Sequence, residues 1–254
     1  MTVSWLNDAG GLRYHLRGLR YAENLWQPFR FALAEWLYEW EPPEKRLVIV
    51  GPSGGWCTQP HFFERFTEVI GLEPDPVAHF FFRRRLRRAP LESRPQLRFE
   101  RDDYLIGEPE RLERFMEREG DAAILFSNIL GQLSVLTGAN DANDPRLTAI
   151  RSVIHRVTVS RSWASFHDRL SGVIAPEVDP IVRTPARLDD GAVVRRFYPT
   201  LADQARTTGE CDELLDHLTA GYFPAERPHA YFSWQLMPGV FHLIEATRGV
   251  REKL

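Results

Sequence analysis

One stretch of the chain, residues 46–76, constrains the fold more than any other. It opens with an apolar run at residues 47–50, breaks at a small-residue loop at residues 51–55, and reaches a second apolar run at residues 69–72, directly followed by Glu73. We expect a short helix between the loop and the second run. Strand, glycine loop, helix, strand and acid in this order form the first half of a nucleotide-binding α/β unit. The stretch therefore predicts an α/β fold with a ligand at the loop.

The chemistry of this stretch suits a ligand that contains a ribose. Glycines in the loop let the backbone approach a ligand, because glycine adopts a positive φ without a Cβ penalty. The helix expected after the loop would offer its unpaired N–H groups. Glu73 lies 73 − 51 = 22 residues after Gly51, near the roughly 20 residues typical of such units, and can accept hydrogen bonds from both ribose hydroxyls.

Composition bounds the class of protein. The chain has 254 residues, 43% hydrophobic and 26% charged, with a net charge of −3, which is typical of a globular domain. Apolar runs stay far below the roughly 20 residues of a membrane span, and the first residues lack the pattern of a secretory signal. Cys57 and Cys211 are too few for a disulfide framework or a zinc cluster. We expect a cytoplasmic protein with no metal and no membrane partner; the composition leaves the oligomeric state open.

The spacing of apolar residues predicts the elements before and after the opening unit. Residues 1–19 are expected to be irregular, and residues 24–40 to form a helix that covers one face of the sheet. In an alternative interpretation this N-terminal part is a lid over the pocket, to which Tyr14 and His15 contribute. Pro76–Arg88 is expected to be a helix that ends in an arginine run. Arginines at a helix C-terminus offset the helix dipole, so a nucleic-acid partner is not expected.

The remaining pattern predicts one domain with a core at residues 46–247, preceded by an N-terminal helical extension at residues 1–45. Further strands are expected at residues 96–100, 121–126 and 162–166, and helices at residues 109–119 and 145–157. Residues 172–209 read as an irregular insertion on the substrate side, with one possible strand at residues 193–197, and residues 211–222 as a helix. The alternating runs at residues 231–237 and 240–246, joined by Pro238 and Gly239, predict a β-hairpin with a type II turn.

Two common nucleotide sites do not fit the loop. A dinucleotide fingerprint that begins at Gly51 would place its second and third glycines at Ser53 and Trp56. The third glycine exists to allow close packing of helix and strand, which Trp56 does not permit. A phosphate-binding P-loop needs Gly-Lys followed by Ser or Thr, which is missing here.

With these excluded, the pattern resembles the class I S-adenosylmethionine-dependent methyltransferases. The resemblance covers residues 46–247 and rests on the order and spacing of several weak motifs. It implies a three-layer Rossmann-like fold with a mostly parallel, seven-stranded sheet and a C-terminal antiparallel hairpin. It implies S-adenosylmethionine as cofactor, with an acid after the second strand on the ribose and an acid after the third on the adenine. The residues so assigned to the cofactor are Gly51, Pro52, Ser53, Gly54, Gly55, Glu73, Pro74, Asp102, Asp103, Ser127 and Asn128.

The resemblance also narrows the acceptor. Enzymes of this family that methylate amino groups of nucleic acids carry Asp/Asn-Pro-Pro-aromatic after the fourth strand, where this chain has Ser127, Asn128, Ile129 and Leu130. Neither cysteine lies where a cytosine-C5 enzyme needs its nucleophile. We therefore expect a small-molecule acceptor. His167, expected just past the fifth strand, is the candidate general base, and Asn128 is expected to orient the acceptor. His242 and Glu245 are expected to be structural.

Two alternatives stay open. Ile49 replaces the acid often found two residues before the first glycine, and Ser53 replaces the middle glycine, so a non-catalytic S-adenosylmethionine-binding protein on the same fold is possible. Residues 51–55 also satisfy Gly-x-Ser-x-Gly, the pattern of a nucleophile elbow in serine hydrolases. A patatin-like hydrolase would use Ser53 as nucleophile and Asp190, in the run Asp190, Gly191, Ala192, as its partner.

Overall fold

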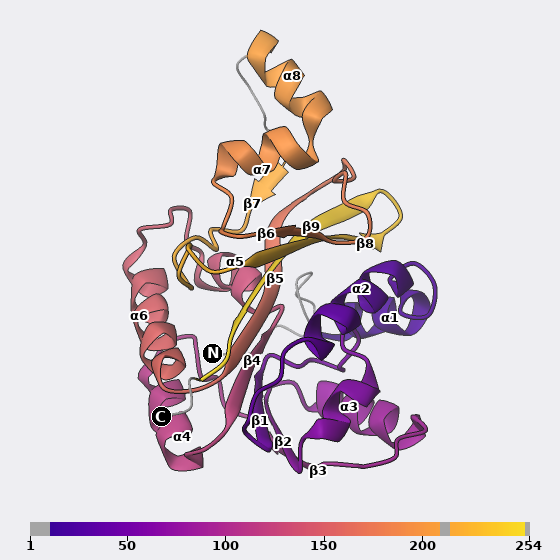
Figure 1. Ribbon diagram of the computed structural model, residues 1–254, viewed down its shortest axis with the longest axis vertical. Coiled ribbons are helices and arrows are strands. Elements are labelled where there is room, and N and C mark those ends of the chain that lie inside the picture. Colours follow the sequence, from indigo (N-terminus) through magenta and orange to yellow (C-terminus); the bar gives the residue numbers. More distant parts are fainter. Residues whose placement is uncertain (1–10, 209–213, 252–254) are drawn as a thin grey trace.

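A single twisted sheet runs through the centre of the computed structural model, which describes residues 11–208 and 214–251 (Figure 1). The strand order is β3-β2-β1-β4-β5-β9-β8-β6, and β7 pairs with β5. Strands β1 to β5 are parallel, as expected for strands separated by helical crossovers. Their bounds are Arg46–Val50, Glu68–Leu72, Gln96–Glu100, Ala123–Ser127 and Trp163–Gly172.

Helices cover both faces of the parallel strands, and alternate strand residues face each layer. Ile49 of β1 packs with α1 (Gly11–Tyr21), α2 (Gln27–Tyr38) and α3 (Pro76–Arg88), whereas Val48 packs with α4 (Glu110–Glu119) and α6 (Pro145–Val159). Figure 1 shows α1 to α3 on one side of the sheet and α4 with α6 on the other. Successive strand residues point to opposite faces, so the continuous apolar runs fill two cores.

The C-terminal hairpin completes the sheet. Strands β8 (His229–Met237) and β9 (Val240–Gly249) are antiparallel, and β9 lies between β5 and β8. Gly239 has a φ of +76°, which fits the second central position of the predicted type II turn. The predicted three-layer Rossmann-like α/β fold, with parallel strands and a C-terminal antiparallel hairpin, is confirmed. Within the described residues the sheet has nine strands, however, because β6 (Val182–Thr184) and β7 (Leu214–Asp216) join the predicted seven.

The segment predicted as an irregular insertion contains regular structure. Residues 193–197, predicted as a strand, belong to the helix α7 (Asp190–Phe197), and α8 (Pro199–Thr208) follows. The side chain of Asp189 accepts a hydrogen bond from Ala192 N at 2.7 Å and caps α7. Val193 and Phe197 pack in a third apolar cluster with Tyr231 and Leu243 of the hairpin. A capped helix with one apolar face therefore replaces the strand.

Four other predictions need correction. Residues 11–21 form α1 rather than an irregular segment. Residues 214–216, part of the helix predicted at residues 211–222, form β7. Cys211 lies outside the described residues. The glycine loop is followed by a short 3₁₀ helix, η1 (Pro60–Arg65), not by an α-helix. Strand β5 extends to Gly172, so His167 and Asp168 lie inside it. In the described parts of the chain, the helices are too short or too polar to cross a membrane.

Candidate functional site

A cavity of about 220 Å³ opens at the carboxyl ends of β1, β2 and β4. The strand order reverses direction between β1 and β4, and ligands of open α/β sheets bind at such a switch point. The structure brings together nine of the residues that the sequence assigned to the cofactor: Gly51, Pro52, Ser53, Glu73, Pro74, Asp102, Asp103, Ser127 and Asn128. Gly54 and Gly55 do not line the cavity.

The loop after β1 is closely packed, and its backbone is strained at Ser53. Gly51 has a φ of +69°, and a Cβ atom there would lie 2.8 Å from Cβ of Ile129. Ser53 also has a positive φ, +48°, which is uncommon for a residue other than glycine. Its backbone N–H donates to Oε2 of Glu73 at 2.9 Å. Because the 3₁₀ helix η1 follows the loop, the α-helix N-terminus that the sequence had led us to expect does not form there.

Glu73 presents a buried carboxyl group to the cavity. Its residue is 9% exposed, and its Oε1 accepts the backbone N–H of Asp75 at 3.1 Å. Burial raises the pKa of Glu73 to about 7, and the two N–H donors from Asp75 and Ser53 offset only part of that rise. Each carboxyl oxygen accepts one backbone N–H and keeps a further lone pair. Glu73 is thus held in place but can accept hydrogen bonds from a ligand.

The segment after β3 forms an apolar side of the cavity that the sequence pattern did not reveal. Tyr104, Leu105 and Ile106 all line it. Oδ1 of Asp103 accepts the backbone N–H groups of Leu105 at 2.9 Å and Ile106 at 2.8 Å, which folds the segment into a tight turn. Asp102, also predicted, pairs with Nη2 of Arg111 at 2.7 Å. The three apolar residues directly after Asp103 were the sequence signal from which this side of the cavity could have been predicted.

Asn128 ties β4 to β5 beside the cavity. Its φ is +54°, a region that asparagine tolerates better than most residues. Its side-chain Oδ1 accepts the backbone N–H of Asp168 at 3.0 Å, and its Nδ2 donates to Oδ2 of Asp168 at 3.3 Å. Ser127, the last residue of β4, precedes it in the lining. Asn128 therefore connects the cavity to a buried carboxylate on the neighbouring strand.

The N-terminal helix α1 closes part of the cavity, as in the lid interpretation, and His15 fastens it. His15 is 1% exposed; its Nδ1 accepts Nε1–H of Trp56 at 3.0 Å, so its Nε2–H donates to Oδ2 of Asp75 at 3.0 Å. The ring of Trp56 lies between two glycines: a Cβ atom would come within 2.5 Å of it at Gly18 and within 2.4 Å at Gly54. A larger side chain at either position would displace the ring.

Tyr14 of α1 and Cys57 also line the cavity. The Tyr14 hydroxyl and the Cys57 sulfur lie 3.4 Å apart. Burial raises the pKa of Cys57 to about 11, and burial also raises the pKa of Tyr14. Both groups are therefore protonated at neutral pH, and Cys57 is not an activated thiol.

The other predicted catalytic residues lie elsewhere. His167 is 1% exposed, Ser165 Oγ lies 3.0 Å from its Nδ1, and its ring faces Phe223 on the side of β5 away from Asp168. Burial lowers the pKa of His167 to about 4. Because it does not line the cavity, we do not propose it as the base. Asp190, the hydrolase partner of Ser53, pairs instead with Arg169 and lines no part of the cavity that Ser53 lines.

Comparison with known proteins gives structural likeness only. No family model matches the chain, and no curated protein matches it. The chain is similar to the N-methyltransferase NodS from Bradyrhizobium japonicum WM9 in complex with S-adenosyl-L-homocysteine, with 10% identity, a TM-score of 0.45 and coverage of 93% of this chain and 98% of NodS. A SAM-dependent methyltransferase from Anabaena variabilis ATCC 29413 aligns with 15% identity, a TM-score of 0.43 and 96% of each chain.

Proposed function

We propose that the protein binds S-adenosylmethionine in the cavity beside Gly51 and Glu73 and transfers its methyl group to a small-molecule acceptor. The observation that carries this proposal is the position of Glu73. It directly follows β2, its carboxyl group is fixed by two backbone N–H groups, and it faces the cavity. A carboxylate in that place can accept hydrogen bonds from both ribose hydroxyls of the cofactor.

The rest of the cavity suits the other parts of the cofactor. The apolar side made by Tyr104, Leu105 and Ile106 lies on the side of β3, where an adenine ring would pack, and Asp103 adjoins it. The end of β4, at Ser127 and Asn128, would then receive the methionine part and the acceptor. Methyl transfer from a sulfonium is a direct displacement, so the main task of the protein is to align acceptor, methyl group and sulfur.

The charge of the cavity supports a small acceptor rather than a nucleic acid. Four acidic residues line it: Glu73, Asp75, Asp102 and Asp103. The chain as a whole carries a net charge of −3. An acidic rim repels a phosphate backbone, whose binding depends on basic contacts. A neutral or cationic small molecule meets no such barrier.

Titration calorimetry with S-adenosylmethionine and S-adenosylhomocysteine tests the binding step. Glu73→Ala should weaken the affinity by about 1–3 kcal/mol, because the ribose hydroxyls would lose their buried acceptors. Glu68→Ala is the matched control: Glu68 begins the same strand at its opposite end and should leave the affinity unchanged. A folded wild-type protein that gives no heat with millimolar ligand would refute the proposal, and equal affinities of wild type and Glu73→Ala would remove Glu73 from the site.

A second experiment separates an enzyme from a non-catalytic binder. The protein is incubated with cofactor labelled in its methyl group and a small-molecule extract of cells, and transfer of label to any product is measured. We expect labelled product with the wild type and a large reduction with Glu73→Ala. Tight cofactor binding without any labelled product would favour the binding protein. Labelling of Ser53 by a fluorophosphonate probe would support the alternative function, a serine hydrolase with Ser53 as its nucleophile.

A further inference from the structure

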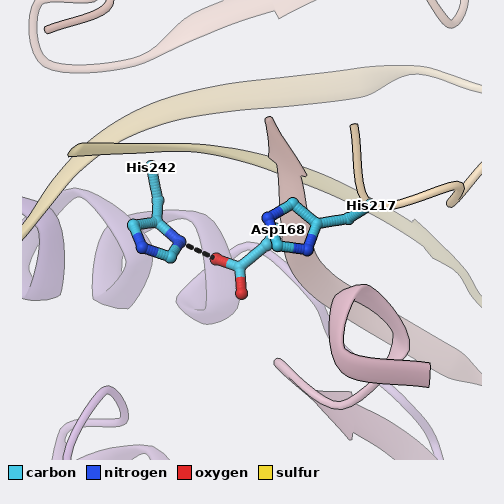
Figure 2. Close-up of side chains that lie close together, drawn as sticks. All are labelled: Asp168, His217 and His242. Carbon is cyan, nitrogen blue, oxygen red and sulfur yellow. Dashed lines mark hydrogen bonds and ion pairs between the residues drawn. The ribbon is translucent and has the colours of Figure 1, made fainter. Parts of the chain in front are cut away.

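Three polar side chains from segments far apart in the sequence meet beside the cavity (Figure 2). Asp168 lies on β5, His217 directly follows β7, and His242 lies on β9. One ligand atom from each lies within 4.8 Å of the other two. The residues Asp168 and His217 are 4% and 7% exposed, and the His242 side chain is 12% exposed. Because both β7 and β9 pair with β5, the sheet itself brings the three residues together.

His217 is held with one ring nitrogen available. Its Nδ1 lies 2.7 Å from the carbonyl oxygen of Gly131, which can only accept a hydrogen bond, so Nδ1 carries the proton. In the neutral ring Nε2 then has a lone pair, which here faces the Ser171 hydroxyl at 2.9 Å. A hydroxyl can rotate away from that lone pair. Histidines that bind metals commonly donate their other N–H to a backbone carbonyl in this way.

The carboxylate of Asp168 is oriented from two sides. Its Oδ1 lies 2.8 Å from Nδ1 of His242, and its Oδ2 accepts Nδ2–H of Asn128. Two imidazole nitrogens and one carboxylate oxygen are a donor set that suits Zn²⁺, Fe²⁺ and related ions rather than Mg²⁺ or Ca²⁺.

We propose that Asp168, His217 and His242 form a binding site for one divalent transition-metal ion. Three protein ligands leave further coordination positions for water or a substrate oxygen. The site adjoins the cavity, because Asn128 lines the cavity and its Nδ2 donates to Oδ2 of Asp168. This extends the expectation from the sequence, in which His242 was structural and no metal was foreseen.

The position of the ion has a consequence that rests on the proposed methyl transfer. An ion beside Asn128 would lie at the end of β4, where the acceptor is expected. It would favour an acceptor with an oxygen donor, because a bound divalent ion lowers the pKa of a coordinated hydroxyl group. Metal binding itself is measured without cofactor, so failure of the metal site and failure of cofactor binding are distinguishable.

The test uses the full chain with its affinity tag removed and its metals stripped by a chelator. Co²⁺ is added while the visible absorption is recorded, and Zn²⁺ binding is measured by calorimetry. We expect binding of about one ion, with a Co²⁺ spectrum typical of nitrogen and oxygen ligands. His217→Ala and His242→Ala should each lose at least 100-fold in affinity, and Asn128→Ala about 10–100-fold, because it orients a ligand.

His155→Ala is the matched control. His155 is exposed on α6, its Nε2 contacts the carbonyl oxygen of Gly221, and its loss should leave metal binding unchanged. His242→Gln and Asp168→Asn, which preserve shape, replace any alanine variant that fails to fold, as judged by circular dichroism. Metal should raise the unfolding temperature of the wild type but not of these variants. A folded wild type that binds neither ion at millimolar concentration, or variants that bind as the wild type does, would overturn the proposal.

Discussion

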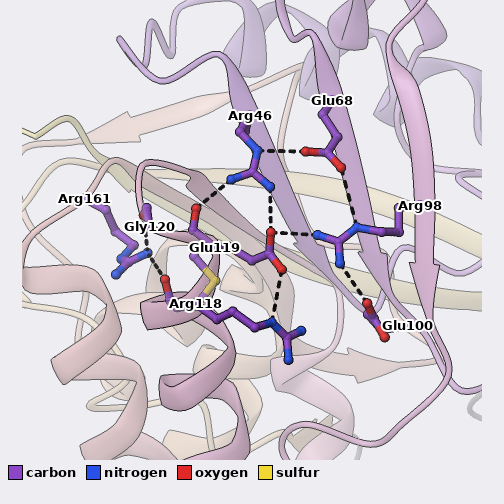
Figure 3. A network of polar contacts seen from close by, with 9 residues as sticks. Arg46, Glu68, Arg98, Glu100, Arg118, Glu119, Gly120 and Arg161 are labelled. Atoms are coloured by element: carbon purple, nitrogen blue, oxygen red, sulfur yellow. Dashed lines mark hydrogen bonds and ion pairs between the residues drawn. The ribbon is translucent and has the colours of Figure 1, made fainter.

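Two buried acidic residues at opposite ends of the parallel strands, Glu119 and Glu73, are held in opposite ways. At the amino ends, Glu119 accepts Nη2 of Arg46 and pairs with Nη2 of Arg98, both at 2.6 Å, and Arg46 also binds Glu68 at 2.7 Å (Figure 3). Burial would raise the pKa of Glu119, but Arg98 and Arg46 outweigh it and keep the pKa below its ordinary value. The carboxylate is already matched by cations within the protein.

At the carboxyl ends, Glu73 is matched only by backbone N–H groups, and its pKa rises to about 7. The backbone beside it is strained at Ser53 and Asn128, two residues other than glycine with positive φ. Strained residues persist where the surrounding structure imposes them, and they gather at functional sites. At the amino ends of the strands, the ion pairs of Glu119 stabilise the fold. At the carboxyl ends, Glu73 keeps hydrogen-bonding capacity for a ligand.

The largest expected effect is at the carboxyl ends of the strands. Gly51→Ala should weaken cofactor binding on the order of 100-fold or more, since the new Cβ atom meets Ile129 and pushes the loop out of place. Gly120→Ala is the control at the amino ends, because Gly120 also has a positive φ, +63°, but has open space around its Cβ position. Calorimetry should show unchanged affinity for Gly120→Ala, with about 1–3 kcal/mol lost in chemical unfolding. Equal affinities of the two variants would break the comparison.

Next in size is the loss of the paired acid. Glu119→Ala should lower the free energy of unfolding by about 1–3 kcal/mol, because Arg46 and Arg98 share the buried Glu119 carboxylate and would both lose it. Both arginines are about a third exposed, so water limits the cost. Urea unfolding measures the loss, and cofactor affinity should stay at the wild-type value. If Glu119→Ala lost cofactor affinity but kept its stability, the amino ends of the strands would serve ligand binding rather than the stability of the fold.

The pH dependence of binding is a smaller effect that belongs to Glu73 alone. A protonated carboxyl accepts fewer hydrogen bonds than a carboxylate, so binding to ribose hydroxyls favours the ionised form. The affinity for S-adenosylhomocysteine should therefore be highest above about pH 7 and fall as the pH drops below it, by at most about tenfold per pH unit. Glu73→Gln should bind weakly at every pH. If this variant kept the wild-type pH profile, another group would be responsible.

Salt should produce the smallest effect, and at the amino ends of the strands. Raising the ionic strength to about 1 M shortens the screening length to about 3 Å and weakens partly exposed ion pairs. The stability difference between wild type and Glu119→Ala should shrink by less than about 1 kcal/mol. Unfolding curves of both proteins at low and high salt measure it. A difference that grows with salt would show that the network is not stabilised by charge.

The sequence predicts the parallel strands and the helix α3 well because their signals are local. Buried strands appear as continuous apolar runs. Helix α3 begins at Pro76, which suits a first turn, directly after Asp75, which caps the helix. Predictions fail where tertiary packing decides. Val193 and Val194 favour a strand by propensity, but a capped helix buries Val193 against the hairpin.

The candidate site likewise has a part that local sequence signals predict and a part that depends on tertiary packing. Glu73 and the loop from Gly51 follow predicted strands, so their common position at the strand ends could be inferred. Tyr14, and Tyr104 with its apolar neighbours, come from segments without a periodic signal. The cluster of Asp168, His217 and His242 depends on how β7 and β9 pair with β5, and no spacing in the sequence specifies that pairing.

The placement of Trp56 between Gly18 and Gly54 also constrains how this chain can diverge. The two glycines come from α1 and from the loop after β1, and both leave room for one indole ring. Positions 18, 54 and 56 should therefore vary together among related chains. A relative that keeps tryptophan at position 56 should keep both glycines, whereas one with a small residue there can carry a larger side chain at position 18 or 54. Such covariation would identify relatives whose N-terminal helix closes the cavity in the same way.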